Sequence, residues 1–114
     1  MRKDLKEYLG EKVKVIVDRP LGSRHPRMGY IYPLNYGYIQ EIKEEYGEEI
    51  NGYVLGKFTP LREFEGYVIA IIHRKYDNQD KFVLAKDKDI YTKEQIMALV
   101  EFKERFFNTE IIMK

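Results

Sequence analysis

Residues 31–39 read Ile-Tyr-Pro-Leu-Asn-Tyr-Gly-Tyr-Ile, and this stretch decides how the rest of the chain is interpreted. Pro33 fixes its own φ angle and restricts Tyr32 to an extended conformation. Asn35 and Gly37 both tolerate positive φ, so the backbone can turn sharply there. A strand-like run of aromatic and apolar residues follows. The stretch therefore predicts a turn that holds phenol groups at fixed positions beside a sheet.

A basic segment that contains glycine lies just upstream, at residues 20–27, and reads Pro-Leu-Gly-Ser-Arg-His-Pro-Arg. Arginine can bind phosphate through two parallel hydrogen bonds, and phenols beside clustered arginines suit an oxyanion. Arg24 and Arg27 are therefore candidate phosphate ligands. The alternative is that Tyr-Pro and Asn-Tyr-Gly only form a well-packed turn, and the residues by themselves favour that interpretation.

Composition and length restrict the class of protein. A chain of 114 residues suffices for one small domain, 1–114, with a modest core. Apolar residues make up 44% and charged residues 34%, the balance of a soluble globular protein. The net charge of +1 does not imply nucleic-acid binding through bulk charge. Cysteine is absent, which excludes disulfides and zinc–cysteine sites and fits a cytoplasmic location. We expect no membrane span and no signal peptide.

Short segments of alternating polarity predict a series of β-strands. Residues 67–72 are apolar on both faces, which indicates a central strand or a barrel stave. Residues 19–35 contain three prolines and two glycines and predict a long irregular connection, of a kind that is often functional. The predicted strands cover residues 12–18, 36–42, 53–58, 67–72, 82–85 and 109–113, with a charged connection at 61–65 and turns at 46–47 and 76–80.

Helical spacing is found near both ends of the chain. Residues 3–9 predict a short helix that stops at Gly10. Thr92 and Gln95 have the spacing of a capping box, which predicts a helix that ends at Asn108. The helix face predicted to cover the sheet comprises Ile96, Leu99, Val100, Lys103 and Phe106. Short strands with one late helix predict a mainly β fold, either a strongly curved sheet or a closed barrel.

Several enzyme motifs are absent from the sequence. Gly56-Lys57 lacks the spacing of a P-loop, and there is no His-Glu-x-x-His helix and no Gly-x-Ser-x-Gly elbow. Loop carboxylates favour a hard cation such as Mg²⁺, and arginine and lysine bind phosphate. Acidic loop residues are more often simply solvated, so this alternative stays open. The acids are Asp18, Glu48, Glu49, Asp77 and Asp80, and the cations are Arg24, Arg27, Arg74 and Lys81.

The order of these motifs resembles the soluble family I inorganic pyrophosphatases over nearly the whole chain. The most specific match is Tyr-Pro-x-Asn-Tyr-Gly-Tyr-Ile at 32–39, and Asp-Lys before an apolar run at 80–85 is a second. The chain looks like a short, diverged, clostridial-type branch. The resemblance implies an OB-like five-stranded barrel with a C-terminal helix. It also implies hydrolysis of pyrophosphate or a related phosphoanhydride, Mg²⁺ (or Mn²⁺) as cofactor, and a homo-oligomer.

The resemblance also implies roles for individual residues. It gives catalytic roles to Asp18, Tyr32 and Tyr36. The phosphate ligands would be Arg24, Arg27, Tyr32, Tyr36 and Lys81, and the metal ligands would be Glu48, Asp77 and Asp80.

Several positions depart from the family pattern. Tyr46 and Asn51 stand where the family signature has aspartate, Gln79 stands at a further ligand position, and Phe106-Phe107 replace Tyr-Lys. Losing carboxylates weakens Mg²⁺ binding and the orientation of the attacking water, so we expect weak hydrolysis.

Three alternatives to hydrolysis remain open, and one is a plain interaction protein or oligomeric structural module. A non-catalytic domain on the same barrel would bind a phosphate-bearing ligand. A barrel surface of this type can also bind single-stranded nucleic acid through stacked aromatic residues and a basic groove, although the near-zero net charge argues against this. The residues available for nucleic acid are Tyr30, Tyr32, Tyr36, Tyr38, Arg24 and Arg27.

Overall fold

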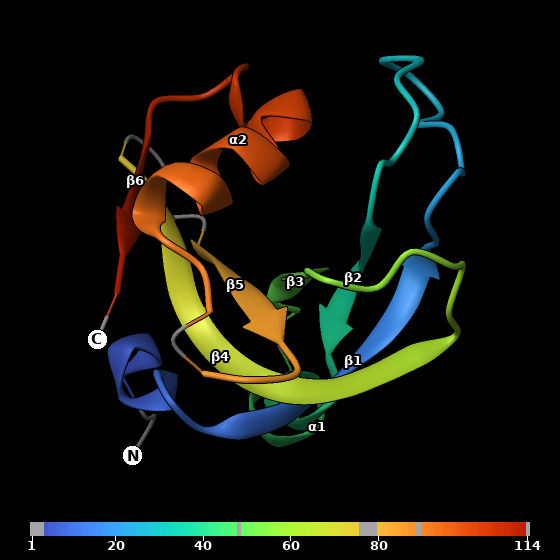
Figure 1. Cartoon of the computed structure of the whole chain (residues 1–114). Coiled ribbons are helices and arrows are strands. Elements are labelled where there is room, and N and C mark those ends of the chain that lie inside the picture. Colours follow the sequence, from blue (N-terminus) through green and yellow to red (C-terminus); the bar gives the residue numbers. More distant parts are fainter. Residues whose placement is uncertain (1–3, 48, 76–79, 89, 114) are drawn as a thin grey trace.

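The computed structural model describes residues 4–47, 49–75, 80–88 and 90–113 (Figure 1). Within these ranges, five strands close into a barrel in the order β1-β2-β3-β5-β4, because β1 also pairs with β4, and β6 adds an edge strand beside β4. The predicted mainly β barrel with a C-terminal helix is confirmed. The strands are β1 (Lys12–Arg19), β2 (Asn35–Ile39), β3 (Asn51–Val54), β4 (Glu63–Arg74), β5 (Asp80–Ala85) and β6 (Thr109–Ile112), and the helices are η1 (Leu5–Tyr8), α1 (Gln40–Tyr46) and α2 (Lys93–Glu104).

The long strand β4 closes the barrel because its two halves pair with different neighbours. Its first half pairs with β1, with Phe64 opposite Val15, and its second half pairs with β5 and β6. Figure 1 shows β4 as one curved strand that runs beneath the others. Gly66 lies near this change of partner, where an added Cβ atom would be 2.7 Å from the Ala85 carbonyl oxygen. The central strand predicted at 67–72 is therefore confirmed, and glycine at position 66 permits its close packing.

Alternation along the strands separates two apolar clusters. One contains residues from every strand of the barrel and is the barrel interior, into which η1 and α1 also pack. The other lies on the outer face of the sheet, beneath α2 and the loop of residues 20–34. The interior includes Tyr8, Val13, Val15, Ile39, Ile42, Val54, Val68, Ile71, Phe82 and Leu84. The outer cluster includes Tyr32, Leu34, Tyr36, Tyr53, Ala70, Ile72, Val83, Ile96, Val100 and Ile111.

The predicted end of the second strand is wrong. β2 ends at Ile39, and α1 begins at Gln40, where a strand over 36–42 was expected to continue. Ile39 and Ile42 are three residues apart and both fully buried, which is helical rather than strand spacing. Gly47, with a φ of 73°, ends α1 in the left-handed conformation. The turn predicted at 46–47 is therefore a helix C-terminus.

Two further boundaries differ from the prediction. β3 covers Asn51–Val54 instead of 53–58, because Gly56 has a φ of 81° and turns the chain. β4 begins inside the segment 61–65 that was predicted as a connection, since burial alternates through its charged start and places Phe64 in the interior. Of the turn predicted at 76–80, only Asp80 lies within the described residues, and there it begins β5.

The terminal elements follow the predictions more closely. η1 is a single 3₁₀ turn within the predicted helix, and β6 is the predicted edge strand. The capping box of α2 forms as expected, since Thr92 Oγ1 accepts from the Gln95 N–H at 3.1 Å and Gln95 Oε1 accepts from the Thr92 N–H at 2.7 Å. Among the described residues, no helix has the length and apolar character needed to cross a membrane.

The buried face of α2 is only partly as predicted. Ile96 and Val100 are fully buried, but Leu99 is 41% exposed and Phe106 lies beyond the end of the helix. Glu104 takes the next position on the buried face, four residues after Val100, and is 2% exposed. A carboxylate at that position requires a buried partner, which the site supplies.

Gly37 is expected to be essential for closing the barrel. It does not take the positive φ that the sequence predicted, and it lies in β2 opposite Val17. An added Cβ atom would be 1.9 Å from the Ile16 carbonyl oxygen. We predict that Gly37→Ala destabilises the protein by about 3 kcal/mol or more, measured by urea unfolding followed by circular dichroism. The control Gly47→Ala changes a glycine with open space around it, and only its positive φ costs about 1 kcal/mol. Equal losses in the two variants would contradict the close-approach explanation.

Candidate functional site

A row of tyrosine side chains lies on the outer face of the barrel. This aromatic row consists of Tyr30, Tyr32, Tyr36 and Tyr53, with successive ring centroids 5.5, 5.6 and 4.9 Å apart. The ring of Phe102, on α2, meets the row edge-on, 5.5 Å from Tyr32. The row therefore runs from the 20–34 loop across β2 to β3, with α2 above it.

Backbone pairing and one buried amide fix the 20–34 loop. The Tyr32 N–H donates to Ser23 O, and the His25 N–H donates to Tyr30 O, both at 2.8 Å. Asn35, which is fully buried, accepts from the N–H groups of Leu21 and Leu61 and donates to Thr59 O, each at 3.0 Å. The amide of Asn35 thus ties the loop to the connection between β3 and β4. The tyrosines at the start of the row are held in place by these bonds.

A buried ion pair lies beneath one end of the row. Lys81 Nζ donates to Glu104 Oε2 at 2.6 Å, and the Tyr53 hydroxyl donates to the same oxygen. Lys81 and Glu104 are 4% and 2% exposed, so the pair is shielded from water. Burial and then the charge of Glu104 raise the pKa of Tyr53 well above its ordinary value, which keeps its hydroxyl a donor. The charge of Lys81 is therefore matched inside the protein.

A second lysine reaches the row from α2. Lys103 Nζ donates to the Tyr30 hydroxyl at 3.3 Å and lies 5.2 Å from the centroid of the Tyr36 ring. Burial, followed by repulsion from Lys81, lowers the pKa of Lys103 to about 8. Arg19, at the end of β1, lies close enough to Tyr32 to lower the pKa of that phenol, although burial raises it overall. Cations therefore lie near both Tyr30 and Tyr32.

Acidic and amide groups lie at the other side of the row. Oriented to suit its neighbours, the Asn51 side chain accepts from the Tyr36 hydroxyl at 2.9 Å and donates to Glu49 Oε1 at 3.3 Å. Partial burial and then the charge of Glu49 raise the pKa of Asp18. Burial raises the pKa of Tyr36, and the charge of Asp18 adds to that rise. Asp18, Glu49 and Asn51 therefore form an acidic edge beside the aromatic row.

Four of the predicted site residues come together in this way. Asp18, Tyr32 and Tyr36 lie at the row and its acidic edge, and Lys81 lies beneath it. Asp80 is the neighbour of Lys81 in β5 but belongs to the opposite face, where its Oδ1 is 2.7 Å from His73 Nδ1 in a separate recess of about 180 Å³. The metal-binding role of Asp80 stays a prediction. Two other predicted metal ligands, Glu48 and Asp77, lie outside the described residues.

The two arginines of the 20–34 loop form hydrogen bonds within that loop. Arg24 is exposed, and its Nη1 donates to Gly29 O at 2.7 Å. Arg27 is also exposed, and its backbone N–H donates to His25 Nδ1 at 3.1 Å. The ring of His25 in turn lies 4.9 Å from that of Tyr30. A phosphate-binding role for Arg24 and Arg27 stays a prediction. The Arg24 guanidinium and the Arg27 backbone N–H each make a hydrogen bond within the loop.

Sequence reasoning missed the contributions of Arg19, Lys103 and Glu104 to the site. One signal could have revealed Glu104, since it continues the buried helical stripe of Ile96 and Val100 at a four-residue interval. A polar residue in an apolar stripe indicates a buried partner. Lys103 was placed on the helix face predicted to cover the sheet, but no local signal indicated its contact with Tyr30.

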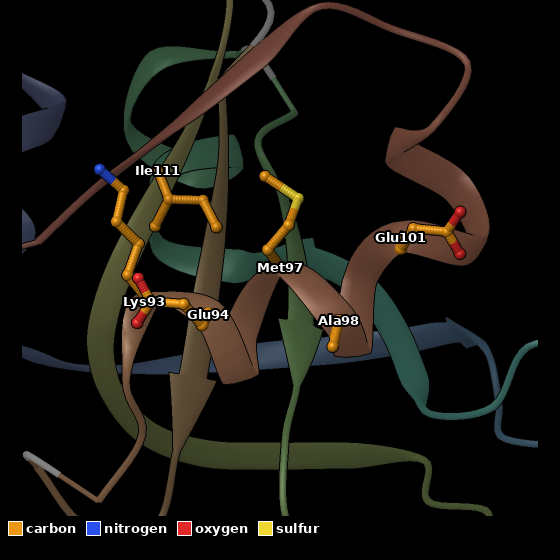
Figure 2. A pocket seen from close by; sticks show the side chains of 6 residues that line it. All are labelled: Lys93, Glu94, Met97, Ala98, Glu101 and Ile111. Atoms are coloured by element: carbon orange, nitrogen blue, oxygen red, sulfur yellow. The ribbon is translucent and has the colours of Figure 1, made fainter.

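A groove between α2 and β6 lies on a different face of the helix. It has a volume of about 450 Å³ and a mainly apolar lining, with Met97, Ala98 and Glu101 from α2 and Ile111 from β6 (Figure 2). Its rim carries Lys93 and Glu94. None of the clustered phenols or acids of the row reaches this groove, so the aromatic row is the stronger candidate for chemistry.

The buried ion pair of Lys81 and Glu104 leads to a prediction about the stability of the protein. Glu104→Gln keeps the shape of the side chain but removes the negative charge that faces the buried ammonium of Lys81, so it should destabilise the protein by about 3 kcal/mol. Replacing both partners with apolar residues, Lys81→Met with Glu104→Leu, should cost less than the single change. The exposed pair Lys14–Glu63 is the control, because Glu63→Gln should change stability by less than about 1 kcal/mol. Urea unfolding measures all three, and a neutral Glu104→Gln would contradict the role of the pair.

Solved structures with the same fold exist, although no family model and no curated protein matches the sequence. The inorganic pyrophosphatase from Ehrlichia chaffeensis matches with a TM-score of 0.69 and 14% identity, covering 92% of this chain and 87% of that one. The enzyme from Helicobacter pylori matches with a TM-score of 0.60 and 13% identity, covering 94% and 84%. The enzyme from Thermus thermophilus matches with a TM-score of 0.56 and 18% identity, covering 90% and 80%. The chain therefore has the fold of the inorganic pyrophosphatases.

Proposed function

We propose that the protein binds pyrophosphate or a related phosphoanhydride at the aromatic row and hydrolyses it weakly with Mg²⁺ or Mn²⁺. The observation that carries this proposal is the junction of phenols and acids, where the Tyr36 hydroxyl donates to Asn51 Oδ1 beside Glu49 and Asp18. A phosphate group needs donors and cations, and a metal needs carboxylates. Both kinds of group meet at this junction, on a fold shared with inorganic pyrophosphatases.

The donors of the row suit a phosphate ligand. Burial raises the pKa values of Tyr32 and Tyr36, so both phenols keep their protons at neutral pH. The proton of Tyr36 is donated to Asn51 Oδ1, so Tyr32 is the phenol of the two that would donate to a phosphate. The resemblance adds Arg24, Arg27 and Lys81 as phosphate ligands. Donors held by a rigid sheet can stabilise charge on a phosphoryl group without reorganising.

The acidic edge fits a sparse metal site. Among the described residues, no cluster of three or more acidic or histidine side chains could hold an ion. Mg²⁺ keeps several waters and commonly uses one or two carboxylates together with substrate phosphates, a donor set that Asp18 and Glu49 can supply. The resemblance adds Glu48 and Asp77. It also names Asp80, whose side chain lies on the opposite face beside His73. When bound, the metal would neutralise phosphate charge and lower the pKa of a bound water.

Three expectations from the resemblance belong to the same proposal. The protein would work in the cytoplasm, would assemble as a homo-oligomer and would belong to a clostridial-type branch of the family. A non-catalytic domain would bind the same ligand without releasing phosphate, so the assay below separates it from an enzyme.

The first test measures phosphate release from pyrophosphate with added Mg²⁺ or Mn²⁺. We expect slow, metal-dependent release, and Asp18→Asn should reduce it at least about tenfold because it removes a carboxylate from the acidic edge. Asp87→Asn changes an exposed aspartate away from the site and should leave the rate unaltered. Absence of release by the unaltered protein with either metal would refute the hydrolase.

The second test restores a carboxylate. Asn51→Asp places a negative charge beside Glu49 and Asp18, and it should increase the Mg²⁺-dependent rate about tenfold and lower the Mg²⁺ concentration required. Combining it with Tyr46→Asp, the other altered position of the signature, should increase the rate further. Rates that stay level or fall in both variants, with unfolding unchanged, would show that the missing carboxylates do not limit activity.

A further inference from the structure

We propose that Lys103, on α2, is the residue that binds a phosphoryl oxygen of the ligand at the aromatic row. The inference rests on the proposed function for its ligand class and goes beyond it by naming the cation. The resemblance points to Lys81, Arg24 and Arg27 for this task. The contacts of Lys103 fit the task better than those of any of the three.

The ammonium group of Lys81 is already bound to a carboxylate of the protein. It lies 2.6 Å from Glu104 Oε2 in a buried pair, and Tyr53 donates to the same carboxylate oxygen. A ligand that drew Lys81 away would leave the carboxylate of Glu104 buried without its counter-charge, which is strongly unfavourable. The pair therefore positions the end of α2, and the ligand needs another cation.

Lys103 has the contacts expected of that cation. Its side chain is half-buried, its ammonium donates to the Tyr30 hydroxyl at 3.3 Å, and it lies over the Tyr36 ring. Among the described residues, no carboxylate forms a salt bridge with it. A phosphate oxygen beside Tyr30 could thus accept from Lys103.

The charges around Lys103 favour an incoming anion. The groups that act on it are Lys81, Arg74 and Arg19, which are positive, and Glu104, which is negative. Since the charge of Glu104 is shared with Lys81, positive charge is in excess. Burial and this excess lower the pKa of Lys103 from 10.5 to about 8, so its proton is held less tightly than in the unfolded chain. Binding an anion would relieve the repulsion.

The loop arginines are poorer candidates on the same criteria. Arg24 and Arg27 are exposed, and the guanidinium of Arg24 already donates to Gly29 O. A solvent-exposed cation gains little from an ion pair, whereas a half-buried one gains more. Removing either arginine should therefore affect the ligand less than removing Lys103.

The test measures binding without turnover. Imidodiphosphate, whose P–N–P bridge resists hydrolysis, is titrated into the full chain in EDTA by isothermal calorimetry. We expect Lys103→Met to weaken binding at least about tenfold, because it removes a charge-assisted hydrogen bond. Lys93→Met, at the first position of α2, should change binding less than about twofold. Arg24→Gln and Arg27→Gln serve as competing variants, and thermal unfolding shows whether each variant is folded.

Lys103→Arg provides a readout that a purely structural role would not change. Arginine keeps its charge at all the pH values used, whereas Lys103 loses its charge above pH 8. Between pH 7 and pH 9 the unaltered protein should therefore lose about tenfold more affinity than Lys103→Arg does. Ionisation of the ligand is common to both proteins and cancels in this comparison.

The outcomes separate this inference from the proposed function. Loss of binding in Lys103→Met, with the pH dependence removed in Lys103→Arg, supports Lys103 whether or not pyrophosphate is hydrolysed. Unchanged binding in Lys103→Met, loss in the loop arginine variants instead, or failure of the unaltered protein to bind imidodiphosphate overturns it. Phosphate release that is unaffected by Lys103→Met would uphold the hydrolase and reject the inference.

Discussion

The buried pair of Lys81 and Glu104 holds the end of α2 against the outer face of the barrel, and the candidate site depends on that placement. Glu104 is the last residue of the helix and Lys81 lies in β5, so one ion pair connects helix to sheet. A buried pair is tolerated only when further hydrogen bonds help offset its desolvation, and Tyr53 provides one. With α2 fixed, Phe102 covers the aromatic row and Lys103 reaches its edge.

Fold elements with strong local signals could be predicted from the sequence. The valine alternation of β1 and the Thr92–Gln95 capping box depend on neighbouring residues alone, so both were found. Helix α1 was missed because its acidic segment follows directly from β2 without a side-chain cap. Among the α1 residues whose side chains the structure describes, only Ile42 enters the interior. The role of Gly37 was also missed, since it depends on how closely β1 approaches, which no local pattern reveals.

The residues of the candidate site also differ in whether a local sequence pattern could reveal them. Asp18, Tyr32 and Tyr36 belong to short motifs and could be singled out before their spatial relation was known. Lys103 and Glu104 carry no motif, and their places in the site arise from α2 packing on strands more than twenty residues away in the chain. Groups recruited by tertiary packing lie beyond what local spacing can show. The departure at Asn51 was visible in sequence, but its bonds to Tyr36 and Glu49 were not.

The amide of Asn51 balances two opposing electrostatic demands. Burial and then the charge of Glu49 already raise the pKa of Asp18, so a third carboxylate at position 51 would add repulsion in the absence of a metal. The neutral amide avoids that repulsion, donates to Glu49 and accepts from Tyr36, which keeps the phenol oriented toward the acidic edge. Asparagine in place of aspartate at position 51 also removes a charged ligand that a divalent cation would use. If the proposed function holds, position 51 would therefore stabilise the metal-free protein at the expense of metal affinity, while the phenol and lysine side of the site would still bind phosphate.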